Sequence, residues 1–150
     1  MGRLTQILET AQARAREQGL PYDGALTPAE AHELLGLAPG SKLIDVRTRA
    51  EWEWVGRVPE SVELEWQTYP GGQPNPAFAA QLARQVDREA LAMFMCRSGA
   101  RSHAAAAIAK AQGFTAVYNI LQGFEGDKDP QGHRNTLGGW RHAGLPWVQG

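Results

Sequence analysis

The chain has 150 residues, of which 43% are hydrophobic and 21% charged, as is ordinary for one globular domain with a sizeable core. Fifteen basic and sixteen acidic residues give a formal net charge of −1, which gives no support for a nucleic-acid partner. A single cysteine excludes an intramolecular disulfide and zinc motifs built on Cys-Cys pairs. The histidines show no metal-ligand spacing, so we expect neither a metal nor another cofactor.

The amino-terminal region carries no visible targeting signal. Residues 1–18 are polar and charged and lack the apolar core of a signal peptide. No apolar run has the length that a membrane span needs, so we expect no membrane partner. A cytoplasmic location is the simplest expectation, and a reducing cytoplasm would keep the thiol available.

The first half of the chain alternates helix and strand signals. Apolar residues at helical spacing predict an amphipathic helix over 3–18, which ends at Gly19 and which we expect to dock on its own domain. Thr27, Pro28 and Glu30 form a capping box with proline at the first helical position, so a second helix begins there. The next segments predict a buried strand, a brief helix and a second strand, over 42–46, 50–54 and 62–65.

The second half continues the alternation. Residues 67–76, rich in glycine, proline and polar residues, predict a long exposed loop. Helices are predicted over 78–88 and 102–112, strands over 91–95 and 116–121, and a glycine-rich tail follows from residue 123. Strands separated by helices predict an α/β domain with a mainly parallel sheet, in which sites lie beyond the carboxyl ends of the strands.

Cys96 falls at such a strand end. The apolar strand 91–95 ends on this thiol, which is followed by a short loop with Arg97, Gly99 and Arg101 and then by a helix-forming segment. A loop of this kind aims backbone N–H groups and a helix N-terminus at the sulfur, which favours a thiolate and builds an anion pocket. A lone cysteine is often only a small buried hydrophobe, but that role needs no flanking arginines. The pattern therefore favours a nucleophilic cysteine.

Four segments resemble the rhodanese family of sulfurtransferases. The run Cys96-Arg97-Ser98-Gly99-Ala100-Arg101-Ser102 is similar to its active-site loop. The segments 43–47 with Glu51-Trp52, 55–61 and 119–124 resemble the other family signatures and occur in the family's order. The resemblance covers residues 25–147, and the segment 66–70 and the Gly-rich tail resemble a bacterial single-domain subgroup of the family. Arg57 stands where the family usually has histidine, and Glu60-Ser61 replace Gly-Ala, so that turn must be built differently.

The resemblance implies a rhodanese-like three-layer α/β domain over residues 25–150, including the Gly/Trp-rich tail, preceded by an N-terminal helical extension over 1–24. It implies a sulfur relay in which the Cys96 thiolate takes a sulfur from an anionic donor such as thiosulfate and passes it to cyanide or a thiol, possibly a protein thiol. The residues expected to hold the persulfide or the donor are Arg97, Ser98, Gly99, Ala100 and Arg101, and Asp45 and Arg47 are expected to support the loop.

Two other functions remain open at this point. A cysteine phosphatase also uses a thiol, an N–H nest and an arginine, but it places five residues between Cys and Arg. Here Arg101 follows Cys96 after four, and Ser102 occupies the phosphatase position. The second alternative is a non-catalytic rhodanese-like module that binds a partner or senses redox state, because a fold does not guarantee a function.

Neighbouring polar residues are assigned mainly structural roles. A buried Asp45 needs a partner, and Arg47 or a loop arginine could provide it. Arg47 and Glu51 lie four residues apart and are predicted to pair with each other. His103 lies near the thiol in sequence, but we expect no catalytic role for it. The aromatic residues Trp66 and Tyr69 are candidates for the rim of the pocket.

Overall fold

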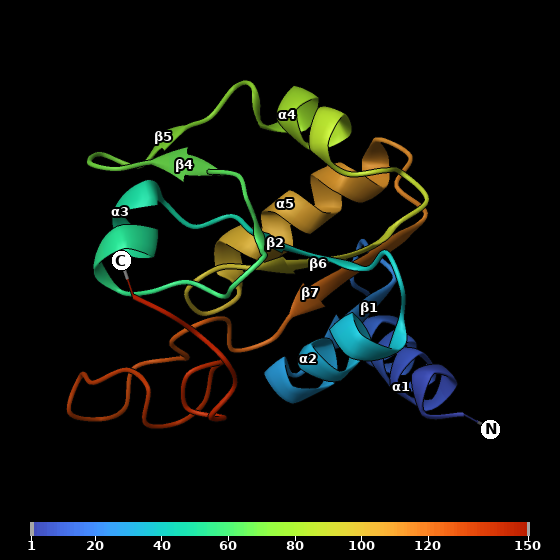
Figure 1. The fold of residues 1–150 in the computed structure, drawn as a ribbon, viewed down its shortest axis with the longest axis horizontal. Helices are drawn as coiled ribbons and strands as arrows, with labels where there is room; N and C mark the ends of the chain where they lie inside the picture. Colours follow the sequence, from blue (N-terminus) through green and yellow to red (C-terminus); the bar gives the residue numbers. More distant parts are fainter. Residues whose placement is uncertain (1, 150) are drawn as a thin grey trace.

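A five-stranded parallel sheet forms the centre of the computed structural model, which describes residues 2–149 (Figure 1). The strand order is β1-β7-β6-β2-β3, and every neighbouring pair is parallel. The strands are β1 (Gly24–Leu26), β2 (Lys42–Asp45), β3 (Val62–Glu63), β6 (Leu91–Met95) and β7 (Ala116–Ile120). The predicted α/β class and the predicted parallel sheet are confirmed.

Helices cover both faces of the sheet and create three layers (Figure 1). One face packs against α4 (Phe78–Gln85) and α5 (Ala100–Ala111), and the other packs against α1 (Arg3–Gln18) and α2 (Pro28–Leu37). The short helix α3 (Arg49–Trp54) and a hairpin of β4 (Gln67–Thr68) and β5 (Gln73–Pro74) lie beyond the carboxyl end of β2. The amino-terminal helix packs on β1 of its own chain, as predicted.

The alternation of side chains along β6 brings Cys96 to one particular layer. Met93 and Met95 belong to the core on the α1 and α2 side. Phe94 belongs to the core on the α5 side, and Cys96 continues this alternation immediately after the strand. The thiol therefore faces the layer in which α5 begins.

Two helices begin at capping boxes that fix where they start. Thr27 and Glu30 exchange side-chain and backbone hydrogen bonds at α2, as the sequence predicts. Thr48 and Glu51 do the same at α3. The second box starts a six-residue helix next to the Cys96 loop and holds the Glu51 carboxylate at the helix N-terminus.

Several predicted bounds differ from the structure. The strand β1 was not predicted, because three residues including a glycine show no periodicity and become a strand only by pairing with β7. The segment 67–76 is not purely a loop, since it contains the β4–β5 hairpin. The helix α5 begins at Ala100, two residues earlier than predicted, and α4 ends at Gln85 rather than at residue 88. Strands β2, β3 and β7 end one or two residues early.

No helix within residues 2–149 combines the length and the hydropathy that crossing a membrane requires.

Candidate active site around Cys96

Cys96 lies at the start of a tight loop between β6 and α5. Its side chain is buried, with 1% of the residue exposed, and the cysteine is free. The Gly99 amide donates a hydrogen bond to Cys96 Sγ at 3.1 Å. Gly99 has φ of 118°, a left-handed value that a residue with a Cβ rarely adopts, so the loop curls back onto the sulfur because glycine stands there.

A second donor reaches the sulfur from the first turn of α5. The Ser102 hydroxyl lies 3.4 Å from Cys96 Sγ and 3.2 Å from the Gly99 carbonyl oxygen, and its one proton donates to one of these two acceptors at a time. Because Gly99 is the N-cap of the twelve-residue α5, the sulfur also lies at the positive end of a helix dipole. A negative charge on this sulfur is thus stabilised by a backbone N–H, a hydroxyl and the helix N-terminus.

The carbonyl groups of the loop are bound by the turn that follows β7. The Phe124 amide donates to the Cys96 carbonyl oxygen at 2.8 Å, and the Glu125 amide donates to the Arg97 carbonyl oxygen at 2.9 Å. A Cβ at Gly123 would clash with that same Cys96 carbonyl oxygen. The close approach of this glycine therefore fixes the backbone that carries the thiol.

Arg101 is bound to Glu51 across the site. Its two terminal nitrogens donate to the two Glu51 carboxylate oxygens at 2.7 and 3.0 Å. Burial raises the pKa of the Glu51 carboxyl, but hydrogen bonds from Arg101 and Thr48 and the charge of the arginine outweigh burial and lower this pKa to about 2. The pair connects the first turn of α5 to the first turn of α3.

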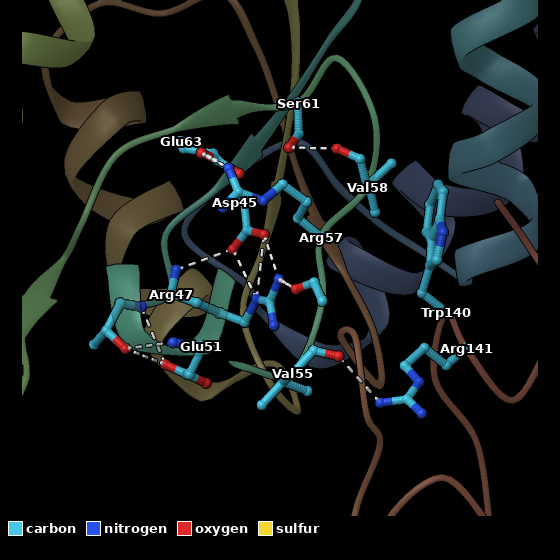
Figure 2. Close-up of polar contacts among 12 residues, drawn as sticks. Asp45, Arg47, Glu51, Val55, Arg57, Val58, Ser61, Glu63, Trp140 and Arg141 are labelled. Carbon is cyan, nitrogen blue, oxygen red and sulfur yellow. Dashed lines mark hydrogen bonds and ion pairs between the residues drawn. The ribbon is translucent and has the colours of Figure 1, made fainter. Parts of the chain in front are cut away.

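A second ion pair, between Asp45 and Arg47, lies at the carboxyl end of β2 (Figure 2). Neither side chain is exposed, and Arg47 Nη2 lies 2.8 Å from Asp45 Oδ2. Arg47 also donates to the Gly56 carbonyl oxygen at 2.7 Å, and its guanidinium lies 4.1 Å from the centre of the Phe124 ring. One of its donors, Nη1, has no hydrogen-bond partner among residues 2–149.

An open cleft of about 500 Å³ lies over the loop. Its walls come from α3, from the β4–β5 hairpin and from the loop itself. The charged and aromatic residues that line it are Glu51, Trp54, Tyr69, Arg97, Arg101 and Glu125. Arg97 is exposed, and among residues 2–149 it takes part in no ion pair. The two loop arginines therefore differ, since only Arg101 is held by a carboxylate.

The predicted site residues fall into two groups. Cys96 and the residues 97–101 form one continuous loop; Ser98 is half-buried, and Ala100 is exposed as the first residue of α5. Asp45 and Arg47 are buried at the end of the neighbouring strand β2, where Asp45 lies in register with Met95, the residue before Cys96.

Sequence reasoning missed two of the residues that organise the loop. Glu51 lies fifty positions from its partner Arg101. The Ser102 hydroxyl near the sulfur was also missed, although its position in the first turn of the following helix is a usable signal.

Of two predictions about neighbouring side chains, the Arg47–Glu51 pair is wrong, and the pocket rim is confirmed for Tyr69 but not for Trp66. Arg47 and Glu51 do not pair, because Arg47 turns into the core toward Asp45 while Glu51 caps α3 and binds Arg101. Tyr69 lines the cleft, but Trp66 packs edge-on against Phe78 in the core.

His103, near the thiol in sequence, binds the Tyr22 hydroxyl through Nδ1 at 2.8 Å. Within residues 2–149, no cluster of three or more His, Cys, Asp or Glu side chains is arranged to hold a metal ion.

The fold and the loop together define a class of protein. Its members are three-layer α/β domains with a parallel sheet and, beyond the carboxyl edge of that sheet, a cysteine whose sulfur accepts a hydrogen bond from the loop backbone. A family model described as the rhodanese-like domain matches residues 27–129, and the chain belongs to that family. An uncharacterized protein of Rickettsia conorii is 33% identical over 120 residues, covering 79% of this chain and 91% of that one.

Solved structures share the fold. The crystal structure of Rv0390 from M. tuberculosis is 44% identical, with a TM-score of 0.79, and the match covers 86% of this chain and 99% of that one. The polysulfide-sulfur transferase homodimer of Wolinella succinogenes is 21% identical, with a TM-score of 0.60 and coverage of 100% and 95%. That second likeness concerns the fold alone.

Proposed function

We propose that this chain is a sulfurtransferase that carries a sulfur atom as a persulfide on Cys96. The observation that carries the proposal is the pair of donors on the sulfur, the Gly99 amide at 3.1 Å and the Ser102 hydroxyl at 3.4 Å. These groups lie at the N-terminus of α5 and stabilise an anionic sulfur without a base. Membership of the rhodanese-like family supports the same chemistry.

In the first step the Cys96 thiolate attacks the outer sulfur of an anionic donor such as thiosulfate. A sulfur–sulfur bond to Cys96 forms, the sulfur–sulfur bond of the donor breaks, and sulfite leaves with the electron pair of that bond. The exposed Arg97 attracts the donor at the mouth of the cleft. Arg101, bound to Glu51, holds the first turn of α5 in place.

In the second step a nucleophilic acceptor, cyanide or a thiol, attacks the outer sulfur of the persulfide. The bond between the two sulfurs breaks, and its electron pair returns to the Cys96 thiolate. No oxidant is consumed and no cofactor takes part. The loop amides from Arg97 to Arg101 would hold the outer sulfur between the two steps. A reducing cytoplasm suits a reaction that begins and ends with a free thiol.

The test is the intact-protein mass after incubation with thiosulfate. The wild type is expected to gain the mass of one sulfur atom, and cyanide should remove it while thiocyanate appears in equal amount. Cys96→Ser is the matched control, because it replaces the sulfur with a smaller hydroxyl oxygen, and it should gain nothing. A folded wild type with a titratable thiol that gains no sulfur from thiosulfate or from polysulfide would contradict the proposal.

The same sample separates the two alternatives. A cysteine phosphatase would hydrolyse p-nitrophenyl phosphate, and we expect no turnover because Ser102, not an arginine, faces the thiol. A non-catalytic binding or redox-sensing module would keep a reactive thiol, and a persulfide formed on it would lose its sulfur to cyanide only once. Release of thiocyanate over many turnovers per Cys96, with thiosulfate in excess, therefore decides between an enzyme and a binding module.

A further inference from the structure

The last residues of the chain form hydrogen bonds to the end of α3. We call residues 141–149 the C-terminal strap. Val148 and Arg57 exchange both backbone hydrogen bonds in an antiparallel bridge, at 2.8 and 2.9 Å. The Gln149 side chain donates to the Trp54 carbonyl oxygen at 2.9 Å. The strap lies outside residues 27–129, so it is not part of the matched family domain.

Val55 and Gly56, which lie between Trp54 and Arg57, also contact the strap. Arg141 donates to the Val55 carbonyl oxygen at 3.4 Å (Figure 2), and its guanidinium lies 4.1 Å from the centre of the Trp147 ring. Trp147 packs so closely on Gly56 that a Cβ there would lie 2.6 Å from its ring. Every residue from 54 to 57 therefore contacts the strap.

The strap is itself fixed to the core. The indole N–H of the fully buried Trp140 donates to the Pro146 carbonyl oxygen at 2.7 Å. Trp147 packs edge-on against Phe124, whose ring also covers the buried Arg47. A rigid part of the molecule thus holds the segment 54–57 in one position.

The held segment forms one wall of the cleft that Arg97 and Arg101 of the Cys96 loop also line. Trp54 and Val55 line the cleft, and Trp54 meets Tyr69 of the facing hairpin edge-on, with ring centres 6.1 Å apart. Trp54 and Tyr69 are 66% and 62% exposed, whereas tryptophan is on average highly buried in folded proteins. A cleft of about 500 Å³ is also much larger than an anion such as thiosulfate needs.

We propose that the C-terminal strap positions Trp54, and that Trp54 and Tyr69 select the sulfur acceptor: a low-molecular-mass thiol with a peptide-sized body. Arg97 and Glu125 give the same cleft charges of both signs, which suits a body that carries both an ammonium and a carboxylate. The thiolate of this acceptor forms the new sulfur–sulfur bond, while the Cys96 persulfide bond breaks and leaves its electron pair on Cys96. The inference rests on the proposed sulfurtransferase function.

The experiment compares two acceptors for the same persulfide-loaded protein. Glutathione is the large probe and cyanide the small one, and intact mass confirms loading before either is added. Trp54→Ala is expected to lower kcat/KM for glutathione about fivefold to tenfold, as for loss of an aromatic contact, and to change kcat/KM for cyanide by less than about twofold. Equal effects on both acceptors, or none on either, would overturn the assignment.

The strap is tested by variants that touch no substrate. Val148→Pro removes the N–H that donates to Arg57, and Gln149→Ala removes the side chain that holds Trp54. Both are expected to reproduce the glutathione-selective loss, and neither should add to the effect of Trp54→Ala in a double variant. Leu137→Ala, in an exposed part of the tail, is the matched control and should change neither acceptor.

The outcomes separate the two proposals. A wild type that acquires no sulfur contradicts the sulfurtransferase function itself. A wild type that loads and discharges normally, with strap variants that affect both acceptors equally or that add to Trp54→Ala, contradicts only the positioning role. The mild Gln149→Ala variant keeps the test decisive if Val148→Pro fails to fold.

Discussion

The two ion pairs next to Cys96 differ in how they are built. Asp45 and Arg47 lie two positions apart in the chain, and neither side chain is exposed. Glu51 and Arg101 lie fifty positions apart, and their side chains are 18% and 21% exposed at the edge of the cleft. The first pair joins a strand end to its own loop, while the second joins two helices across the site.

Only the pair at the cleft is placed to influence the chemistry of Cys96. Arg47 is enclosed by Asp45, the Gly56 carbonyl oxygen and the Phe124 ring, so changing it alters the core. Arg101 belongs to the first turn of α5, one residue before the Ser102 hydroxyl that contacts the sulfur. The buried pair is expected to govern stability, and the pair at the cleft is expected to govern both stability and the geometry of the loop.

Breaking the buried pair should have the largest effect. Arg47→Met leaves Asp45 as an uncompensated buried charge, which is expected to lower the free energy of unfolding by about 3–5 kcal/mol. Urea unfolding measures this loss. Arg49→Met is the matched control, because the Arg49–Glu53 pair is largely exposed, and it should change stability by no more than about 0.5 kcal/mol. Similar losses in both variants would refute the distinction.

Breaking the cleft pair should give a smaller, pH-dependent effect. The pKa of Glu51 is about 2 in the folded protein against an ordinary value of 4.5. The carboxylate therefore stabilises the fold fully above pH 4.5, and this contribution is lost as the pH falls through about 2. The shift corresponds to at most about 3 kcal/mol, and partial exposure reduces it to about 2 kcal/mol.

The variant Glu51→Gln tests the direction in which the contribution of Glu51 to stability changes with pH. At pH 7 the variant should be less stable than the wild type by about 2 kcal/mol, and the difference should shrink as the pH falls toward 2. Urea unfolding at pH 7, 5 and 3 follows the trend. A difference that stays constant over this range would show that the Glu51 charge is not its cause.

The smallest effect on stability is expected at Arg97. Arg97→Gln removes an exposed cation that lines the cleft, so the free energy of unfolding should change by no more than about 0.5 kcal/mol. The KM for thiosulfate should nevertheless rise about fivefold to tenfold, the cost of losing a charge-assisted contact. Steady-state kinetics measures this KM. Arg101→Gln is measured in parallel, because this variant is expected to lose stability whereas Arg97→Gln is not. An unchanged KM would remove Arg97 from donor binding.

Local patterns predicted much of the fold. The Thr27–Glu30 capping box and the apolar run 91–95 marked α2 and β6 correctly, because caps and buried strands are set by residues close in sequence. The strand β1 was missed because its three residues become a strand only by pairing with β7. The bounds of α4 and α5 shifted by two or three residues, since helix ends depend on what packs against them.

The candidate site also contains features that neighbouring residues predict and features that depend on contacts between distant parts of the chain. The loop from Cys96 to Arg101 is contiguous, so the sequence contains its glycine, its two arginines and the helix behind it. The predicted partner of Glu51 is wrong, because the spacing suggests Arg47 whereas the fold brings α3 against the start of α5 and pairs Glu51 with Arg101. Trp54 gave no signal, since nothing local shows that an exposed ring will form a cleft wall.

The α/β class, the cysteine loop at a strand end and the family resemblance could be read from the sequence, because each depends on neighbouring residues and their order. The binding of Arg101 by Glu51, and the contacts of the C-terminal strap with residues 54–57, appear only in the folded chain. Distance along the chain explains this division. Contacts between residues fifty or more positions apart exist only after the sheet and its helices have packed.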